Sequence, residues 1–263
     1  PLATSVWQRY IDSQEKDAYG WAVLPDLLPA LGSKQQQKLL GDPTWKTSQL
    51  LYRLADRLEP KLRFSEAAAM WRSQVGFSER LLAQAPENAQ FARNLSVSYN
   101  KLGDMQHALG NTEAALRRYE QSLAIRERLL AQAPESADFA RGLSVSYNKL
   151  GDMQQALGNT EAALRRYEQS LAIAERLLAQ APESAQFARD LSISYEKLGD
   201  MQQALGNTEA ALRRYEQGLA IAERLLAQAP ENVQFAHDLS VSYHKLGQMH
   251  KSGGNNTLAL HFY

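Results

Sequence analysis

The sequence contains no cysteine, which excludes both a disulfide framework and a thiolate metal site. It also lacks an excess of either charge, because 29 acidic residues balance 29 lysines and arginines. Such a chain has no overall field that would draw it to nucleic acid or to an anionic membrane. No apolar run approaches the roughly 18 residues of a membrane-spanning helix, and the first residues lack the basic-then-apolar pattern of a secretory signal. We therefore expect a cytoplasmic protein that binds neither nucleic acid nor membrane.

Recognisable catalytic and metal-binding motifs are missing as well. His237 and His244 are seven residues apart in the sequence, about 10 Å along a helix, which is too far for them to share one zinc ion. No histidine stands with a carboxylate and a serine in a recurring triad pattern, and there is no glycine-rich phosphate loop. We therefore expect no enzyme activity, no metal and no cofactor.

What the sequence does contain is one segment repeated at a spacing of 48 residues. Residues 86–133 and 134–181 differ at only five positions, and the pattern continues through 182–229 and into 230–263. A fixed period of 20–50 residues is typical of a solenoid, in which each unit covers an apolar surface of the next.

Each repeat has the periodicity of two helices. Phe91, Leu95, Tyr99 and Leu102 recur at spacings of three and four residues, which places them on one helical face. After the turn sequence LGNTE, a second helix carries a wider apolar surface. Each helix should span about 21 residues, or about 31 Å.

The helix ends are predicted by residues with known capping preferences. Gly110 suits a left-handed C-terminal cap, and Asn111 or Thr112 suits the next N-cap. The predicted N-caps of the first helices are Asn88, Ser136, Ser184 and Asn232.

The repeated residues resemble a tetratricopeptide repeat (TPR). The resemblance rests on bulky, Leu-Gly, Gly, Ala, aromatic and small residues at that family's spacings, namely Tyr99, Leu102, Gly103, Gly110, Ala115, Tyr119, Ser122 and Leu123. It implies an all-α fold, an α-solenoid of stacked antiparallel helix hairpins wound into a right-handed superhelix. The family's usual unit has 34 residues, whereas this one has 48 because its proline comes later, so the groove width cannot be transferred.

The expected organisation follows this frame. We interpret 1–41 as an N-terminal helical capping segment and 42–85 as a degenerate first unit, because Leu54, Ala55, Ala67 and Trp71 occupy equivalent positions. Three full units follow at 86–133, 134–181 and 182–229, and 230–263 is a truncated last unit.

The repeats differ in sequence mainly along one stripe of the first helix. At about 100° per residue the variable positions span about 140°, away from Phe91 and Leu95. In the family that this chain resembles, the first helices line a concave groove, so the resemblance makes this stripe a groove that binds a partner. The candidate partner-binding residues are Gln90, Asn94, Asn100, Asp104, His107, Asp138, Asn148, Asp152, Gln155, Gln186, Asp190, Glu196, Asp200, Gln203 and His244.

Three functional hypotheses remain open. The first is a non-catalytic scaffold that binds a partner peptide or helix in the groove. The second is a sensor or regulatory arm of a larger enzyme, because the array stops within a helix and we expect the polypeptide to continue beyond Tyr263. Nucleic-acid recognition ranks last, because the stripe carries acidic residues and the paired arginines, such as Arg117 and Arg118, have glutamates nearby to pair with. Free drift of exposed positions after duplication is the alternative explanation of the stripe.

The truncated last hairpin also predicts self-association. It should leave an apolar edge uncovered, formed by Tyr243, Leu246, Leu258 and Leu260, which could pair with another chain.

Overall fold

The computed structural model describes residues 2–12, 23–24, 27–28, 30–31, 33–58, 63–254 and 259–260. All regular structure in these ranges is helical. The chain divides into two compact units, Pro1–Gln132 and Ala133–Tyr263, so the boundary falls at the end of the first full repeat. The two units are described separately below.

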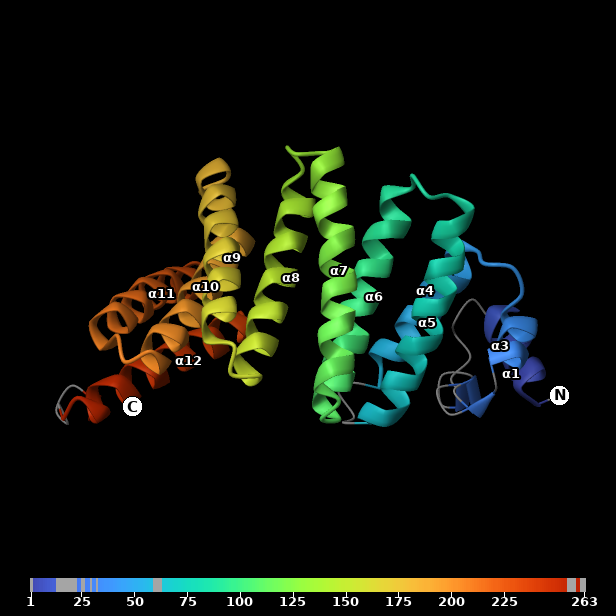
Figure 1. Cartoon of the computed structure of the whole chain (residues 1–263), viewed down its shortest axis with the longest axis horizontal. Coiled ribbons are helices and arrows are strands. Elements are labelled where there is room, and N and C mark those ends of the chain that lie inside the picture. The colour runs from blue at the N-terminus through green and yellow to red at the C-terminus, as the bar shows by residue number, and fades with distance from the viewer. Residues whose placement is uncertain are drawn as a thin grey trace. The chain divides into compact units, whose positions relative to one another are not determined.

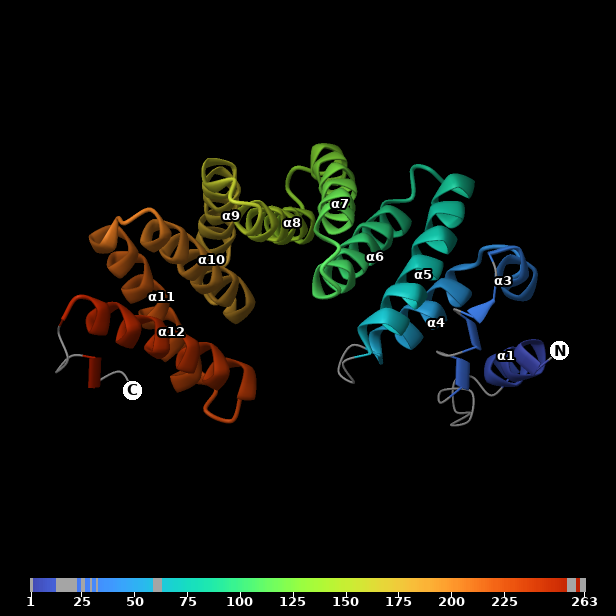
Figure 2. The same ribbon diagram turned by 60° about the horizontal axis from the view of Figure 1, so that its bottom comes forward.

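Both units consist of helices that pack in chain order (Figures 1 and 2). The helices of the first unit are α1 (Leu2–Asp12), α3 (Ser33–Leu40), α4 (Trp45–Asp56), α5 (Phe64–Gln84), α6 (Ala89–Ala108) and α7 (Thr112–Gln132). Those of the second unit are α8 (Ala137–Ala156), α9 (Thr160–Gln180), α10 (Ala185–Ala204), α11 (Thr208–Gln228) and α12 (Val233–Ser252). The all-α fold of stacked hairpins is therefore confirmed within each unit.

The predicted helix lengths are also confirmed. The first helix of each full repeat has 20 residues and the second has 21. Helix α5 begins and ends one repeat length, 48 residues, before α7. Helix α4, however, begins at the position equivalent to Arg93, which lies inside α6 rather than at its start. The degenerate segment thus forms a hairpin whose first helix is shorter than its equivalents.

The helix ends follow the sequence in most respects. The side chains of Asn88, Ser136, Ser184 and Asn232 all accept a hydrogen bond from a backbone N–H of the first turn. Gly110 has a φ of 78°, and the Asn111 N–H donates to the Gln106 carbonyl at 2.8 Å, which completes a Schellman cap. Of the two residues offered for the N-cap of the second helices, asparagine holds this position in α9 and α11, but the side chains of Asn159 and Asn207 make no capping hydrogen bond.

One close contact joins the two helices of each full hairpin. The ring of Tyr167 is fully buried against Gly151, and a Cβ added to that glycine would lie 2.6 Å from the tyrosine Cε1. The same arrangement occurs at Gly103 with Tyr119 and at Gly199 with Tyr215. A glycine is therefore required for the helix backbones to approach this closely.

The structure bears on two expectations about the ends of the chain, the N-terminal capping segment and the uncovered C-terminal edge. In the first unit, Trp7 and Tyr10 of α1 are buried in one core with residues of α4 and α5, while much of 1–41 lies outside the described residues. At the other end, Leu246 is only 1% exposed because it packs with Tyr215, so its place on an uncovered edge is wrong. Leu260 is 76% exposed, and Leu258 lies outside the described residues.

Candidate partner-binding surface

Several stripe residues hold the tyrosine that joins each hairpin. The Tyr167 hydroxyl donates to Asp152 Oδ1 at 2.7 Å, and Gln155 Oε1 lies 3.0 Å from the same hydroxyl oxygen. Tyr215 bonds in the same way to Asp200 and Gln203, and Tyr119 bonds to Asp104 at 2.8 Å. Burial, followed by the carboxylate of Asp152, raises the pKa of Tyr167, so this hydroxyl remains a donor at neutral pH.

The same aspartates also connect successive hairpins. Lys197 Nζ on α10 lies 2.6 Å from Asp152 Oδ1 on α8, and Lys245 lies at the same distance from Asp200. Each carboxylate thus accepts a tyrosine hydroxyl from its own hairpin and an ammonium group from the next one. These aspartates therefore act within the array, whatever they contribute to a partner.

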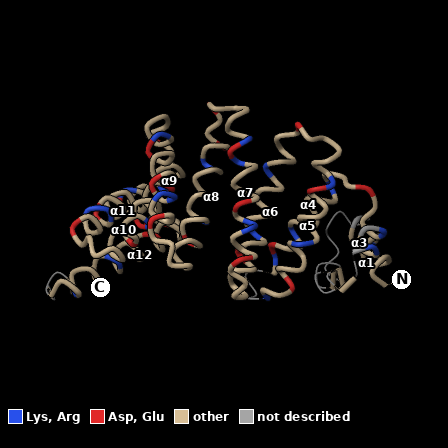
Figure 3. The backbone as a smooth tube through the Cα atoms, viewed as in Figure 1, with Lys and Arg blue, Asp and Glu red and all other residues tan. Residues whose placement is uncertain are grey.

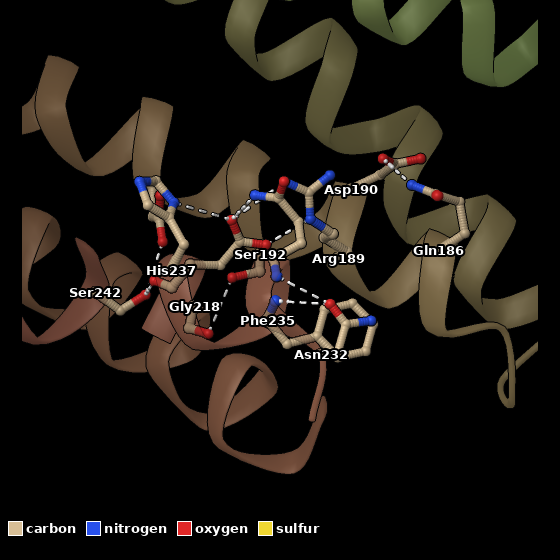
Figure 4. Close-up of polar contacts among 12 residues, drawn as sticks. Gln186, Arg189, Asp190, Ser192, Gly218, Asn232, Phe235, His237 and Ser242 are labelled. Carbon is tan, nitrogen blue, oxygen red and sulfur yellow. Dashed lines mark hydrogen bonds and ion pairs between the residues drawn. The ribbon is translucent and has the colours of Figure 1, made fainter. Parts of the chain in front are cut away.

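A second ion pair joins neighbouring first helices of the second unit. Arg141 on α8 pairs with both carboxylate oxygens of Asp190 on α10, and Arg189 pairs in the same way with Asp238 on α12. Figure 4 shows Arg189 among these contacts, and the amide of Gln186 directed at Asp190. Burial acts to raise the pKa of Asp238, but the hydrogen bonds from Arg189 and Gln234 outweigh it and hold this pKa below its usual value.

The position shared by Asn100, Asn148 and Glu196 is less exposed than we expected. Asn100 is only 8% exposed, and Glu196 on α10 accepts a hydrogen bond at 2.7 Å from the Ser242 hydroxyl of α12. The expectation that this position faces away from buried contacts is therefore wrong for Asn100. The physical reason is visible at Glu196, where the position faces the first helix of the following hairpin.

The remaining stripe residues differ in exposure. Asn94 and Asn148 are partly buried. The exposed members are Gln90, His107, Asp138, Gln186, Gln203 and His244. The stripe is therefore two sets of residues, an internal set that joins helices and an exposed set that is accessible to a partner.

The arginines of the second helices make contacts within the chain, as expected. Arg165 and Arg213 lie 3.8 and 3.9 Å from the glutamates four residues before them. The following arginines lie over tyrosine rings of the first helices, as Arg166 does over Tyr147 at 5.5 Å. Figure 3 shows basic and acidic residues interspersed along the helices of each unit.

One pocket lies among α4, α5 and α6 of the first unit, with a volume of about 400 Å³. Its lining includes Trp45, Ser48 and Tyr52 from α4, Gln74 from α5, and Arg93 and Asn94 from α6. The stripe predicted Gln90 and Asn94 as binding residues, but it missed Arg93 and the whole contribution of α4 and α5. The pocket brings these residues together.

Neither a metal-binding cluster nor a membrane-spanning helix occurs in the described ranges. They contain no group of three histidine or acidic side chains that could hold a metal ion. Nor does any helix there combine the length and apolarity needed to cross a bilayer.

The partly buried Glu196 leads to a prediction about pH. Burial raises the pKa of Glu196 above its usual value of 4.5, with the nearby Asp238 and Asp200 adding to the effect and Ser242 and Lys245 opposing it. The folded state therefore binds a proton on the Glu196 carboxyl more tightly than the unfolded state does. This protonation stabilises the folded state below pH 4.5, and the stabilisation is lost as the pH rises through the folded-state pKa.

We therefore expect Glu196→Gln to raise the melting temperature at pH 7 and to have a smaller effect at pH 4, because the amide still accepts the Ser242 hydroxyl. Thermal unfolding followed by circular dichroism at both pH values measures this. Glu216→Gln, at an exposed site on α11, is the matched control and should leave the melting temperature unchanged. A Glu196→Gln protein less stable than the parent at pH 7 would show that the charge is favourable there.

The described helices define an α-helical repeat protein in which a glycine–tyrosine contact closes each full hairpin and ion pairs join neighbouring hairpins. A family model described as Tetratricopeptide repeat matches residues 142–216, and another of the same description matches residues 95–136. These two segments of the chain therefore match tetratricopeptide repeats.

Solved structures support the same fold. BtubC (BKLC) from P. vanneervenii is 18% identical over 99% of this chain and 85% of that chain, with a TM-score of 0.61. A putative kinesin light chain from Podosopora anserina with nearly identical TPR-like repeats is 21% identical over 82% of this chain and 92% of that chain, with a TM-score of 0.57. At these identities the likeness concerns the fold alone. No curated protein matches the sequence. Repeats of this family serve generally as non-catalytic protein-interaction scaffolds.

Proposed function

We propose that this chain binds a segment of a partner polypeptide along the first helices of its hairpins. The observation that carries the proposal is the contrast between the two kinds of helix. Exposed positions at the ends of the first helices differ between copies, as Gln90 does from Asp138 and His107 from Gln203, whereas the segment EAALRRYEQ of the second helices is repeated unchanged. Variation at exposed positions of the first helices is what a partner with different contacts at each repeat would require.

The packing of the hairpins supports this role. In the second unit, the aspartates that pair with arginines and lysines of neighbouring first helices fix the spacing of those helices. A preformed surface loses little conformational entropy on binding, so a modest number of contacts can give useful affinity. The exposed stripe residues are the ones that we propose contact the partner.

The experiment is a selection from a library of 12-residue peptides displayed on phage, followed by affinity measurements on the selected peptides. We expect single alanine replacements of exposed first-helix residues, such as His107, Asp138 and Gln186, to weaken at least one selected peptide by about tenfold. The matched controls are the exposed second-helix residues Glu120→Ala and Glu168→Ala, which should change affinity less than about twofold. Failure to select any peptide, or losses confined to the second-helix variants, would contradict the proposal.

A further inference from the structure

The pocket among α4, α5 and α6 occurs where the ion pair between first helices is absent. In the second unit, Arg141 of α8 pairs with Asp190 of α10. Ninety-six residues earlier, the same two positions hold Trp45 and Asn94. Neither can form the pair, so α4 and α6 are not joined at this point, and both residues line the open pocket.

Arg93 is a cation without the partner that its equivalents have. Arg141 and Arg189 each pair with an aspartate 49 residues later in the sequence, but the residue 49 positions after Arg93 is Gly142. The Nε atom of Arg93 is buried and has no hydrogen-bond partner among the described residues. Because a buried N–H donor without an acceptor is costly, and because this donor belongs to a cation, the position favours an incoming anion.

Gln74 supplies a second unsatisfied group in the same pocket. Its side chain is 1% exposed, and its amide nitrogen donates to the hydroxyls of Ser48 and Ser78 at 3.1 and 3.2 Å. Its Oε1 atom is buried without a partner. The equivalent positions in the other hairpins carry serine or glycine, so this acceptor is specific to the first hairpin. A buried carbonyl oxygen of this kind gains most from a partner's N–H group.

We propose that this pocket receives an aspartate or glutamate residue of the partner polypeptide, an inference that rests on the proposed function. The carboxylate pairs with Arg93 and with the amide NH₂ of Asn94, whose oxygen already accepts from Gln90. A peptide N–H donates to Gln74 Oε1, and Trp45 and Tyr52 form the aromatic part of the wall. Aspartate and glutamate are absent from the pocket lining, so no acidic side chain competes for Arg93 there. The volume of about 400 Å³ is within the usual range for a ligand site.

The proposal changes the expected chemistry of the partner. Free aspartates in the stripe would favour a basic peptide, but Asp152 and Asp200 are bound within the chain by lysine and tyrosine. The unsatisfied charge lies instead at Arg93, and its sign is positive. The partner should therefore carry an acidic residue where it crosses the first full repeat.

The test uses the selected 12-residue peptides as the probe, each synthesised with its acidic residue and with the corresponding amide. For the parent chain, changing glutamate to glutamine in the peptide should weaken binding by about tenfold or more. For Arg93→Gln the same peptide change should have almost no effect, because the two changes remove the same contact. Asn94→Asp should weaken the acidic peptide as well, and it should fold, since aspartate occupies the same position at 190 and 238.

Arg117→Gln is the matched control, because it removes the same charge from an exposed site on α7 of the same unit. It should leave the preference for the acidic peptide intact, and thermal unfolding verifies that each variant is folded. Selected peptides without a shared acidic residue, or an acidic preference that survives in Arg93→Gln, would overturn the pocket assignment and leave the proposed function standing. A selection that yields no peptide would overturn both.

Discussion

Replacing Tyr167 with alanine should destabilise the second unit by about 3–5 kcal/mol, the range found when a large buried side chain is removed. The Tyr167 ring is fully buried between α8 and α9, and its hydroxyl is bonded to Asp152 and Gln155. The change therefore leaves a cavity and removes a hydrogen bond to a carboxylate at the same time. Urea denaturation followed by circular dichroism measures the loss.

Tyr167→Phe separates the two contributions. It keeps the ring but removes the hydroxyl, and Asp152 retains its ion pair with Lys197 at 2.6 Å. We expect a loss of about 1–2 kcal/mol, the range for one hydrogen bond to a charged group. If alanine were no more destabilising than phenylalanine, the buried ring would not be what holds the hairpin together.

Replacing Gly151 with alanine should have the second largest effect, a loss of about 1–3 kcal/mol. The added Cβ would lie 2.6 Å from the Tyr167 ring, which is closer than real Cβ atoms approach another heavy atom, so the ring or a helix must move. This cost exceeds the gain of about 0.5–1 kcal/mol that alanine usually brings to a helix interior. The measurement is again urea denaturation.

Gly76→Ala in α5 is the matched control, because nothing lies within 4 Å of the added Cβ and the equivalent residue in the full repeats is alanine. It should stabilise the chain slightly. Combining Gly151→Ala with Tyr167→Leu should cost less than the sum of the two changes, since the smaller side chain gives space to the new Cβ. Strict additivity would mean that the glycine and the tyrosine do not depend on each other.

The elements of the fold that depend on local sequence could be predicted. Helix periodicity and the caps at Asn88 and Gly110 involve residues a few positions apart, so the sequence alone indicates them. The family resemblance indicated that Gly103 and Tyr119 are both positions of the repeat pattern. The structure shows why, because the tyrosine ring packs directly against the glycine.

The use of the stripe could not be predicted in the same way. Arg141 bonds to a residue 49 positions away and Lys197 to one 45 positions away, and only the stacked hairpins bring these residues together. The sequence nevertheless contained an indication of these ion pairs. Asp190 and Asp238 each follow an arginine at a distance of one repeat length plus one residue. The pocket was missed for the same reason, since it depends on where that pattern stops at Trp45 and Asn94.

The most direct test of the account is hydrogen–deuterium exchange of the whole chain with and without a selected peptide. The account predicts slower exchange in α4 and in the first half of α6, and along other first helices that the peptide reaches. The second helices α7, α9 and α11 should be unchanged on their exposed sides. Protection confined to those second helices, with α4 and α6 unaffected, would contradict the claim that the first helices bind the partner.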